Sequence, residues 1–150
     1  GQEGVVQEIR VFQTWLRTFD HRVIILPNSQ ITTTQIVNYS LLPLRRMEVA
    51  VGVGYGDDLK KARELLLKIA SEHPAVVEDP PPVARVMALA DSSITLTLYA
   101  FTRNDDHVDA RSQIVEAIRD TFAANGINIP CPQRDLHVYY AEPPPATASR

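Results

Sequence analysis

Hydrophobic positions in the first third of the chain come in short runs that are rich in β-branched and aromatic residues. These runs predict four strands, over residues 4–12, 14–19, 22–27 and 34–40. Asp20-His21 separates the second run from the third and predicts a hairpin turn. Several short strands in so short a stretch favour a small all-β barrel or sandwich.

From residue 47 onward, segments in which apolar residues alternate, as in strands, are interspersed with segments in which they have helical spacing. The alternating runs predict four strands, over residues 47–55, 83–90, 92–101 and 134–140. Helical spacing predicts two helices: one over 57–74 through Leu59, Ala62, Leu66 and Ile69, and one over 107–126 through Val108, Ile114, Val115, Ile118 and Phe122. The order β-α-β-β-α-β is that of a ferredoxin-like sandwich, so we expect an α+β fold.

Residues at the helix ends agree with these two helices. The pair Asp57-Asp58 precedes the first helix, where a carboxylate caps free N–H groups and suits the positive end of the helix dipole. His73-Pro74 ends that helix. Asn125-Gly126 follows the second helix and is typical of a C-cap.

The expected elements divide the chain into four parts. They are a β domain at 1–46, a mixed α/β domain at 47–134, a C-terminal strand at 135–140 and a tail at 141–150. Residues 41–46 are the expected hinge between the first two parts. The tail has three consecutive prolines and no apolar periodicity, so we expect it to be disordered.

Charge is spread unevenly over the chain, whose formal net charge is −3. Residues 1–46 carry five Lys or Arg and three Asp or Glu, whereas residues 47–140 carry nine and fourteen. An acidic body argues against a general nucleic-acid binder, which needs a basic surface to displace counterions from phosphates. RNA-binding RRM modules share the β-α-β-β-α-β order, but the expected central strand "SSITLTLYAF" is uncharged and lacks their basic aromatic signature.

Three further features of the sequence limit the class of protein. The single cysteine, Cys131, excludes an internal disulfide and a Cys-based zinc cluster. No apolar run reaches the roughly 18–20 residues that cross a bilayer. The sequence begins at Gly1 inside a strand-like pattern, and we therefore expect it to be a piece of a longer protein with a segment upstream.

Glycines at 52, 54 and 56 lie between an expected strand and an expected helix, where phosphate-binding loops occur. The stretch "VGVGYGDD" has neither G-x-G-x-x-G nor G-K-[ST], and it places two aspartates where a phosphate needs positive charge. Close strand packing followed by an acidic N-cap explains the same residues and is the favoured interpretation.

No catalytic or metal-binding constellation emerges from the remaining polar residues. The histidines at 21, 73, 107 and 137 never stand three or four apart, so no helix presents a metal-binding pair. Asp105, Asp106 and Asp109 suit helix capping better than paired-carboxylate catalysis, and Cys131 has no activating partner. We therefore expect no enzyme activity, no cofactor and no metal.

Three stretches in the same order resemble one family. "LRTFDHRVIILPNSQI", "VNYSLLPLRRMEVAVGVGYGDDLKKA" and "GINIPCPQRDLHV" are similar to the cytoplasmic region of the small-conductance mechanosensitive channels. The resemblance covers roughly residues 1–140. It implies a homo-heptamer with membrane helices upstream and a hollow cage on the cytoplasmic side, with a β domain that is Sm-like. Ions and small osmolytes would pass through the cage when the cell meets a hypo-osmotic shock.

The resemblance gives two stretches an expected role. Pro27, Asn28, Ser29 and Gln30 form a corner after a strand, which either turns the chain locally or also contacts a neighbouring subunit. The final strands of seven copies would close a small barrel, so an oligomer interface is expected at Leu136, His137, Val138, Tyr139 and Tyr140.

The favoured interpretation is a non-enzymatic cage that supports heptamer assembly and filters solutes, at the cytoplasmic side of the cell membrane. The alternative is a soluble regulatory or ligand-binding domain with a ferredoxin-like core, which would form a smaller oligomer. An enzyme using Asp105, Asp106 or His107 would require a pocket that the sequence does not show.

Overall fold

The computed structural model describes residues 2–139, and the chain divides into two compact units, Gly1–Leu41 and Leu42–Arg150. Each unit contains an antiparallel sheet, and each has at least one helix. The expected α+β class is therefore confirmed. Tyr140 and the tail at 141–150 lie outside the described residues.

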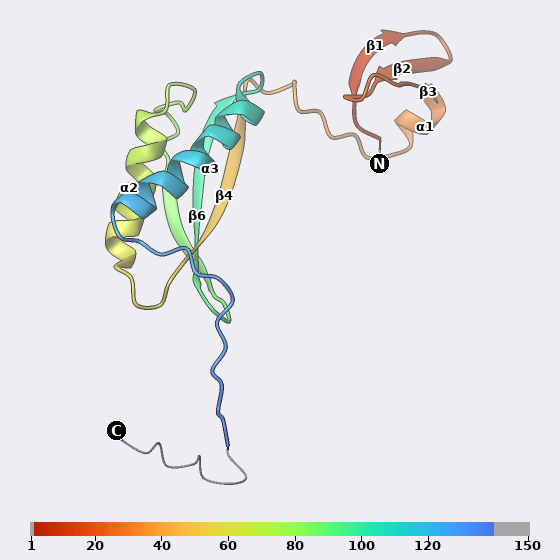
Figure 1. The fold of residues 1–150 in the computed structure, drawn as a ribbon. Helices are drawn as coiled ribbons and strands as arrows, with labels where there is room; N and C mark the ends of the chain where they lie inside the picture. The colour runs from red at the N-terminus through yellow and green to blue at the C-terminus, as the bar shows by residue number, and fades with distance from the viewer. Residues whose placement is uncertain (1, 140–150) are drawn as a thin grey trace, which may run out of the picture. The chain divides into compact units, whose positions relative to one another are not determined.

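The first unit is a three-stranded antiparallel sheet followed by one helical turn (Figure 1). Its strands are β1 (Val5–Ile9), β2 (Gln13–Arg17) and β3 (Val23–Pro27), in the order β1-β2-β3, and α1 spans Asn28–Thr32. The hairpin predicted at Asp20-His21 is confirmed, with His21 at a φ of 63°. The Thr18 side chain accepts the Arg22 N–H at 3.0 Å and bonds to the Asp20 carboxylate, which holds the turn closed.

The fourth strand expected at 34–40 is wrong. These residues form an irregular segment with bends at 34, 39 and 40, and the Asn38 carboxamide oxygen accepts the N–H groups of Ser40 (2.9 Å) and Leu41 (3.0 Å). An Asn that bonds its own following backbone competes with a sheet ladder, which explains why the alternating pattern did not give a strand. The unit is a single open sheet, so an Sm-like barrel or a sandwich is not confirmed within the chain.

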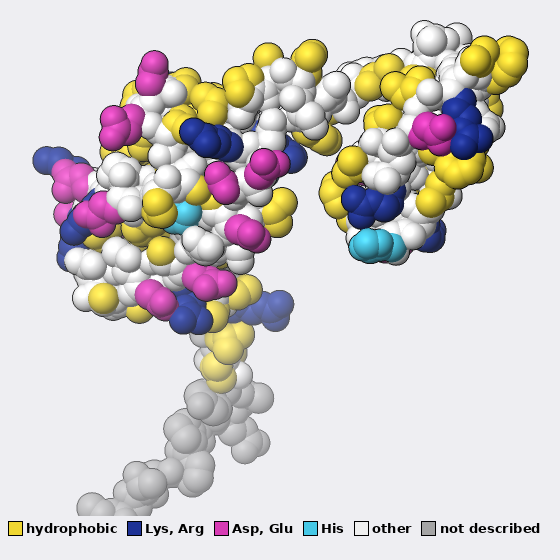
Figure 2. Space-filling model, turned by 90° about the horizontal axis from the view of Figure 1, so that it is seen from above, with side chains coloured by type: hydrophobic (Ala, Val, Ile, Leu, Met, Phe, Trp, Pro, Cys, Tyr) yellow, Lys and Arg dark blue, Asp and Glu magenta, His cyan; other side chains and the backbone are white. Residues whose placement is uncertain are grey.

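Apolar side chains of the first unit are exposed on its surface, as Figure 2 shows. Among residues 2–41, only Thr14 and Thr18 are buried, and no hydrophobic side chain is. The exposed set includes Val5, Val6, Ile9, Val11, Phe12, Phe19, Val23 and Ile25. The sheet therefore lacks an apolar core of its own.

The second unit packs two helices on one face of a three-stranded antiparallel sheet (Figure 1). The strands are β4 (Leu44–Val53), β5 (Val83–Leu89) and β6 (Ile94–Arg103), in the order β4-β6-β5. The helices are α2 (Leu59–Glu72) and α3 (His107–Ala124). Between sheet and helices lies the core, which includes Met47, Val49, Leu96, Leu98, Leu66, Ile114 and Phe122.

Both predicted helices are confirmed, but the buried face of α3 is shifted by one position. Ile114, Ile118 and Phe122 are buried as expected, whereas Val108 is 72% exposed and Val115 is also exposed. His107 and Ala110 complete the buried stripe instead. Val108 and Val115 are seven residues apart and so share a helix face, but that face lies beside the stripe that contacts the core.

The C-cap predicted at Asn125-Gly126 is a full Schellman motif. Gly126 has a φ of 71°, its N–H donates to the Ala123 carbonyl oxygen at 3.4 Å, and the Ile127 N–H donates to Phe122 O at 2.9 Å. Ile127 is buried in the same core as Phe122. This contact is the usual partner of the motif and fixes how the chain leaves α3.

At the ends of this unit, one expectation needs correction and another stays a prediction. Residues 44–46, placed in the hinge, belong to β4, where they pair with Arg103, Thr102 and Phe101. Residues 134–139, expected as a strand, pair with no other segment of the described chain. The observed order is therefore β-α-β-β-α, and the complete ferredoxin-like arrangement is not confirmed. Among the described residues, no helix is long and apolar enough to cross a membrane.

Candidate functional site

The corner after β3 is a local junction built around Asn28. Pro27 pairs with Gln13 as the last residue of the β3 ladder, and Asn28 begins α1. The Asn28 carboxamide accepts the Thr14 hydroxyl at 2.8 Å and donates to the carbonyl oxygens of Arg10 (2.8 Å) and Val11 (3.1 Å). Asn28 therefore joins the end of the hairpin to the β1–β2 connection, a role that sequence reasoning missed because its partners are far away in the chain.

Ser29 and Gln30, the other two corner residues, act through their backbone. The carbonyl oxygen of Ser29 accepts the hydroxyls of Thr32 (3.2 Å) and Thr33 (2.9 Å). That of Gln30 accepts the Thr34 hydroxyl at 2.9 Å. The corner thus begins a helical turn, and the hydroxyls of the threonines that follow satisfy its carbonyl oxygens.

Replacing Asn28 with Ala should destabilise the first unit by about 1–3 kcal/mol, because the buried Thr14 hydroxyl and two carbonyl oxygens lose their partner. Urea unfolding followed by the fluorescence of Trp15, the sole tryptophan, measures this unit directly. Gln30→Ala is the matched control, since the Gln30 side chain makes no hydrogen bond within the described residues. Equal unfolding midpoints for the two variants would contradict the role assigned to Asn28.

The glycine-rich loop between β4 and α2 holds a carboxylate where a phosphate-binding loop would hold its ligand. Oδ2 of Asp57 accepts the N–H groups of Gly54 (3.2 Å) and Asn128 (2.9 Å). Asp58 is the N-cap of α2 and accepts the N–H groups of Lys60 (2.9 Å) and Lys61 (3.1 Å). The acidic N-cap is confirmed, and the loop's own aspartates occupy the donors that a phosphate would need.

His107 and the aspartates around it lie at or just before the start of α3. The His107 ring is buried at the start of α3, with Nδ1 3.2 Å from the Thr102 hydroxyl. Burial lowers the pKa of His107, and the positive charges of Arg45 and Arg111 lower it further, so the neutral ring is favoured. Asp106 is the N-cap residue of α3 but makes no side-chain cap bond, and Asp109 lies in the first turn.

Nothing among residues 2–139 gathers into a metal site or an activated nucleophile. No group of three His, Cys, Asp or Glu residues in that range could hold a metal ion. His73 contacts Gln113 through Nε2 at 3.0 Å and accepts the Ala75 N–H at 3.2 Å, so it closes the end of α2. Cys131 is exposed.

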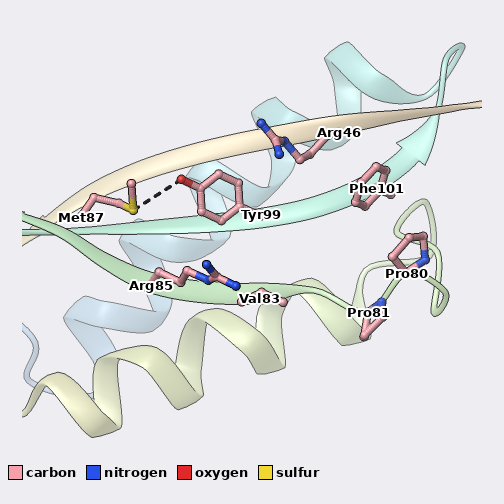
Figure 3. Close-up of a pocket in the computed structure, with 8 residues that line it drawn as sticks. All are labelled: Arg46, Pro80, Pro81, Val83, Arg85, Met87, Tyr99 and Phe101. Atoms are coloured by element: carbon pink, nitrogen blue, oxygen red, sulfur yellow. Dashed lines mark hydrogen bonds between the residues drawn. The ribbon is translucent and has the colours of Figure 1, made fainter.

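The face of the second sheet opposite the helices carries a shallow hollow (Figure 3). The Arg46 guanidinium lies 5.3 Å from the centre of the Tyr99 ring and pairs with Glu48. The Tyr99 hydroxyl lies 3.5 Å from the Met87 sulfur. The lining consists of Arg46, Pro80, Pro81, Val83, Arg85, Met87, Tyr99 and Phe101. The ionisable side chains of this lining are those of Arg46, Arg85 and Tyr99, and the wall carries no carboxylate.

The expected interface residues near the C-terminus are strongly exposed. Leu136, Val138 and Tyr139 have exposed fractions of 84%, 69% and 89%, and His137 lies between them. Alternating apolar side chains on an unpaired, extended segment are typical of a strand without its partner. Tyr140 falls outside the described residues, so the structure places four of the five expected residues.

Comparison with known protein families matches both units. The family model described as "Mechanosensitive ion channel MscS, C-terminal" matches residues 47–129, more than half of the chain. The model "Mechanosensitive ion channel, beta-domain" matches residues 1–41. The chain belongs to the MscS family of mechanosensitive ion channels. This confirms the resemblance that the three sequence stretches indicated, and the family is one of channels rather than of enzymes.

Relatives in the MscS family match over nearly all of this chain. It is 32% identical to the small-conductance mechanosensitive channel of Edwardsiella ictaluri, covering 94% of this chain and 49% of the relative. It is 34% identical to an uncharacterized MscS family protein of Archaeoglobus fulgidus, covering 89% of this chain and 47% of the relative. The chain thus spans about half the length of these curated relatives.

Solved structures extend the match to three dimensions. The crystal structure of Helicobacter pylori MscS in its closed state superposes with a TM-score of 0.88 at 28% identity, covering 93% of this chain and 56% of the other. Arabidopsis thaliana MSL1, solved by cryo-EM, gives a TM-score of 0.71 at 17% identity and supports the fold alone. The MscS fold therefore covers both units.

Proposed function

We propose that this chain is the cytoplasmic cage portion of a small-conductance-type mechanosensitive channel. The single observation that supports it most is that both MscS family models match in order, over 1–41 and 47–129, in a chain whose fold follows Helicobacter pylori MscS. The cage would lie on the cytoplasmic side of the membrane, to which helices upstream of residue 1 would attach it. Its partners would be copies of itself, together with the ions and small osmolytes that leave the cell on hypo-osmotic shock.

Homo-heptamer assembly is part of this proposal, and the exposed apolar surface supports it. The first unit has no buried hydrophobic side chain among residues 2–41, and residues 136–139 are extended and exposed. Apolar surface on this scale marks protein interfaces. Seven copies of the segment 135–140 would close a small barrel and leave no strand edge open.

Filtering of solutes would follow from the charge of the cage wall. Residues 47–140 carry an excess of five acidic charges per copy, so an assembly of seven copies would surround its interior with a strong field. Such a field favours entry of one sign of ion and weakens as salt rises. Arg46 and Arg85, which line the hollow on the helix-free face of the second sheet, would modify the field locally.

The mass of the assembled chain separates the cage from its alternative. Native mass spectrometry of the 150-residue chain should give seven copies, because the subunit contacts proposed here lie within it. A soluble regulatory or ligand-binding domain would instead be a monomer or small oligomer. Its binding site would be the hollow on the helix-free face of the second sheet. A mass of one or two copies at every concentration would overturn the cage proposal in favour of that alternative.

A further inference from the structure

The loop of residues 54–57 contacts the segment that follows α3. We name residues 125–133 the exit segment, because the chain passes through them on its way from α3 to the expected barrel strand. The Gly54 N–H donates to Asn128 O at 3.1 Å as well as to Asp57 Oδ2, which also accepts the Asn128 N–H. Loop and exit segment are thus joined by backbone and by side chain at one residue.

Two more hydrogen bonds hold the exit segment on either side of Asn128. The Lys61 ammonium group donates to Asn125 O at 2.7 Å, and the Gln133 N–H donates to the Ser92 hydroxyl at 3.1 Å. The Tyr55 hydroxyl of the loop donates to Ala90 O at 2.7 Å. Loop, exit segment and β5–β6 turn therefore meet at one end of the sheet.

Glycine at position 54 leaves room for the Asp57 carboxylate in this contact. Gly54 is buried, and a Cβ on it would lie 2.9 Å from Asp57 Oδ2, closer than real Cβ atoms approach. A side chain there would displace the carboxylate from the Asn128 N–H. Gly54, one of the three glycines that suggested a phosphate loop, is thus explained by its close approach to Asp57 and Asn128.

Two prolines restrict the backbone between Asn128 and the C-terminal strand, so the position of Asn128 influences the direction of the chain beyond it. Pro130 and Pro132 each fix φ near −65° and hold the preceding residue in an extended conformation. Two prolines two residues apart limit the conformations open to this segment. An error in the placement of Asn128 would therefore reach residue 134, where the expected barrel strand begins.

We propose that the loop of residues 54–57 is the docking site of the exit segment, and that Asp57 is the positioning residue that sets the direction of the C-terminal strand in each copy. Seven strands can close a barrel only if all copies present them in the same register and tilt. This inference rests on the proposed function, because it concerns how that assembly forms.

The neighbouring aspartate supplies a matched control. Asp57 and Asp58 each accept two backbone N–H groups, but Asp58 caps its own helix while Asp57 reaches a residue 71 positions away. Removing either carboxylate costs local hydrogen bonds of the same kind. Only the removal of Asp57 should alter the exit segment.

The test compares Asp57→Ala with Asp58→Ala in the 150-residue chain, by native mass spectrometry over a dilution series and by thermal unfolding. We expect Asp57→Ala to raise the concentration at which half of the chains are assembled by about tenfold or more, as loss of a charge-assisted hydrogen bond predicts. Asp58→Ala should lower the melting temperature while leaving that concentration within about twofold of the unaltered chain. If Asp57→Ala fails to fold, Asp57→Asn, which keeps one oxygen, takes its place.

Each result decides between outcomes. Equal assembly of the Asp57 and Asp58 variants would overturn the inference, whatever their melting temperatures. If the unaltered chain does not assemble at all, the proposed function fails, and hydrogen exchange then tests the docking site by itself. Faster exchange of the Asn128 amide in Asp57→Ala but not in Asp58→Ala would still support the docking, whereas unchanged exchange would refute it.

Discussion

Removal of residues 134–150 should convert the assembled chain into single copies or small oligomers. The deletion takes away Leu136, Val138 and Tyr139, whose side chains are largely exposed in the single chain and would be buried between copies. Burying each such side chain contributes about 1.5–3 kcal/mol, so seven copies would lose a large part of the free energy of association. Light scattering coupled to size-exclusion chromatography measures the change in mass.

A shorter deletion is the control for this prediction. Removal of residues 141–150 alone takes away the proline-containing tail and keeps the whole segment 135–140. That variant should assemble like the unaltered chain. If the long deletion keeps the mass of the unaltered chain, the expected interface at Leu136–Tyr140 is wrong, and assembly would depend on the first unit instead.

Replacing Phe122 with Ala should cost about 3–5 kcal/mol of the free energy of unfolding of the second unit. Phe122 is fully buried, and its carbonyl oxygen accepts the Ile127 N–H that closes the Schellman motif of α3. Among the described residues, one hydrophobic core packs α2 and α3 against the sheet, and the substitution leaves a cavity in it. Urea unfolding followed by the helical circular dichroism signal measures the loss.

Val108→Ala is the control for Phe122, because it shortens an apolar residue of the same helix that is exposed to solvent. Its expected cost is about 0.5 kcal/mol or less. The comparison also tests the observed orientation of α3, since the sequence pattern assigned both residues to the core. Similar costs for the two variants would mean that α3 packs through a different face.

Local signals were enough to predict both helices of the second unit. Asp58 is the N-cap of α2, and Gly126 follows the C-terminal end of α3. Each acts on backbone groups within one turn of its own helix, so its role can be predicted from neighbouring residues in the sequence. The face of α3 was predicted less well, because Val108 and His107 differ by one position and hydrophobicity favours the wrong one. Burial of His107 depends on Thr102 in β6, which helical periodicity does not report.

Contacts between distant residues explain what the sequence could not predict. Asn28 and Asp57 are of residue types that are common in turns and helix caps, so the sequence predicts only local roles for them. Their partners Arg10 and Asn128 are distant in the chain and are identified only in the folded structure. Residues 34–40 alternate like a strand, but a strand needs a neighbour to pair with, and the Asn38 carboxamide instead accepts the backbone N–H groups of Ser40 and Leu41. Barrel closure by residues 135–140 stays a prediction, because its partners would be other copies of the chain.

The open sheet of the first unit has a consequence for how the protein matures. The unit has about 40 residues and one three-stranded sheet, and no apolar side chain is buried among residues 2–41. A unit of this kind is close to the limit of independent stability. If copies associate as proposed, this unit draws its stability from its neighbours, and the folded fraction becomes a function of protein concentration. A newly made copy would then remain a target for proteolysis at the first unit until enough partners have been synthesised, which couples the quantity of the protein to its survival.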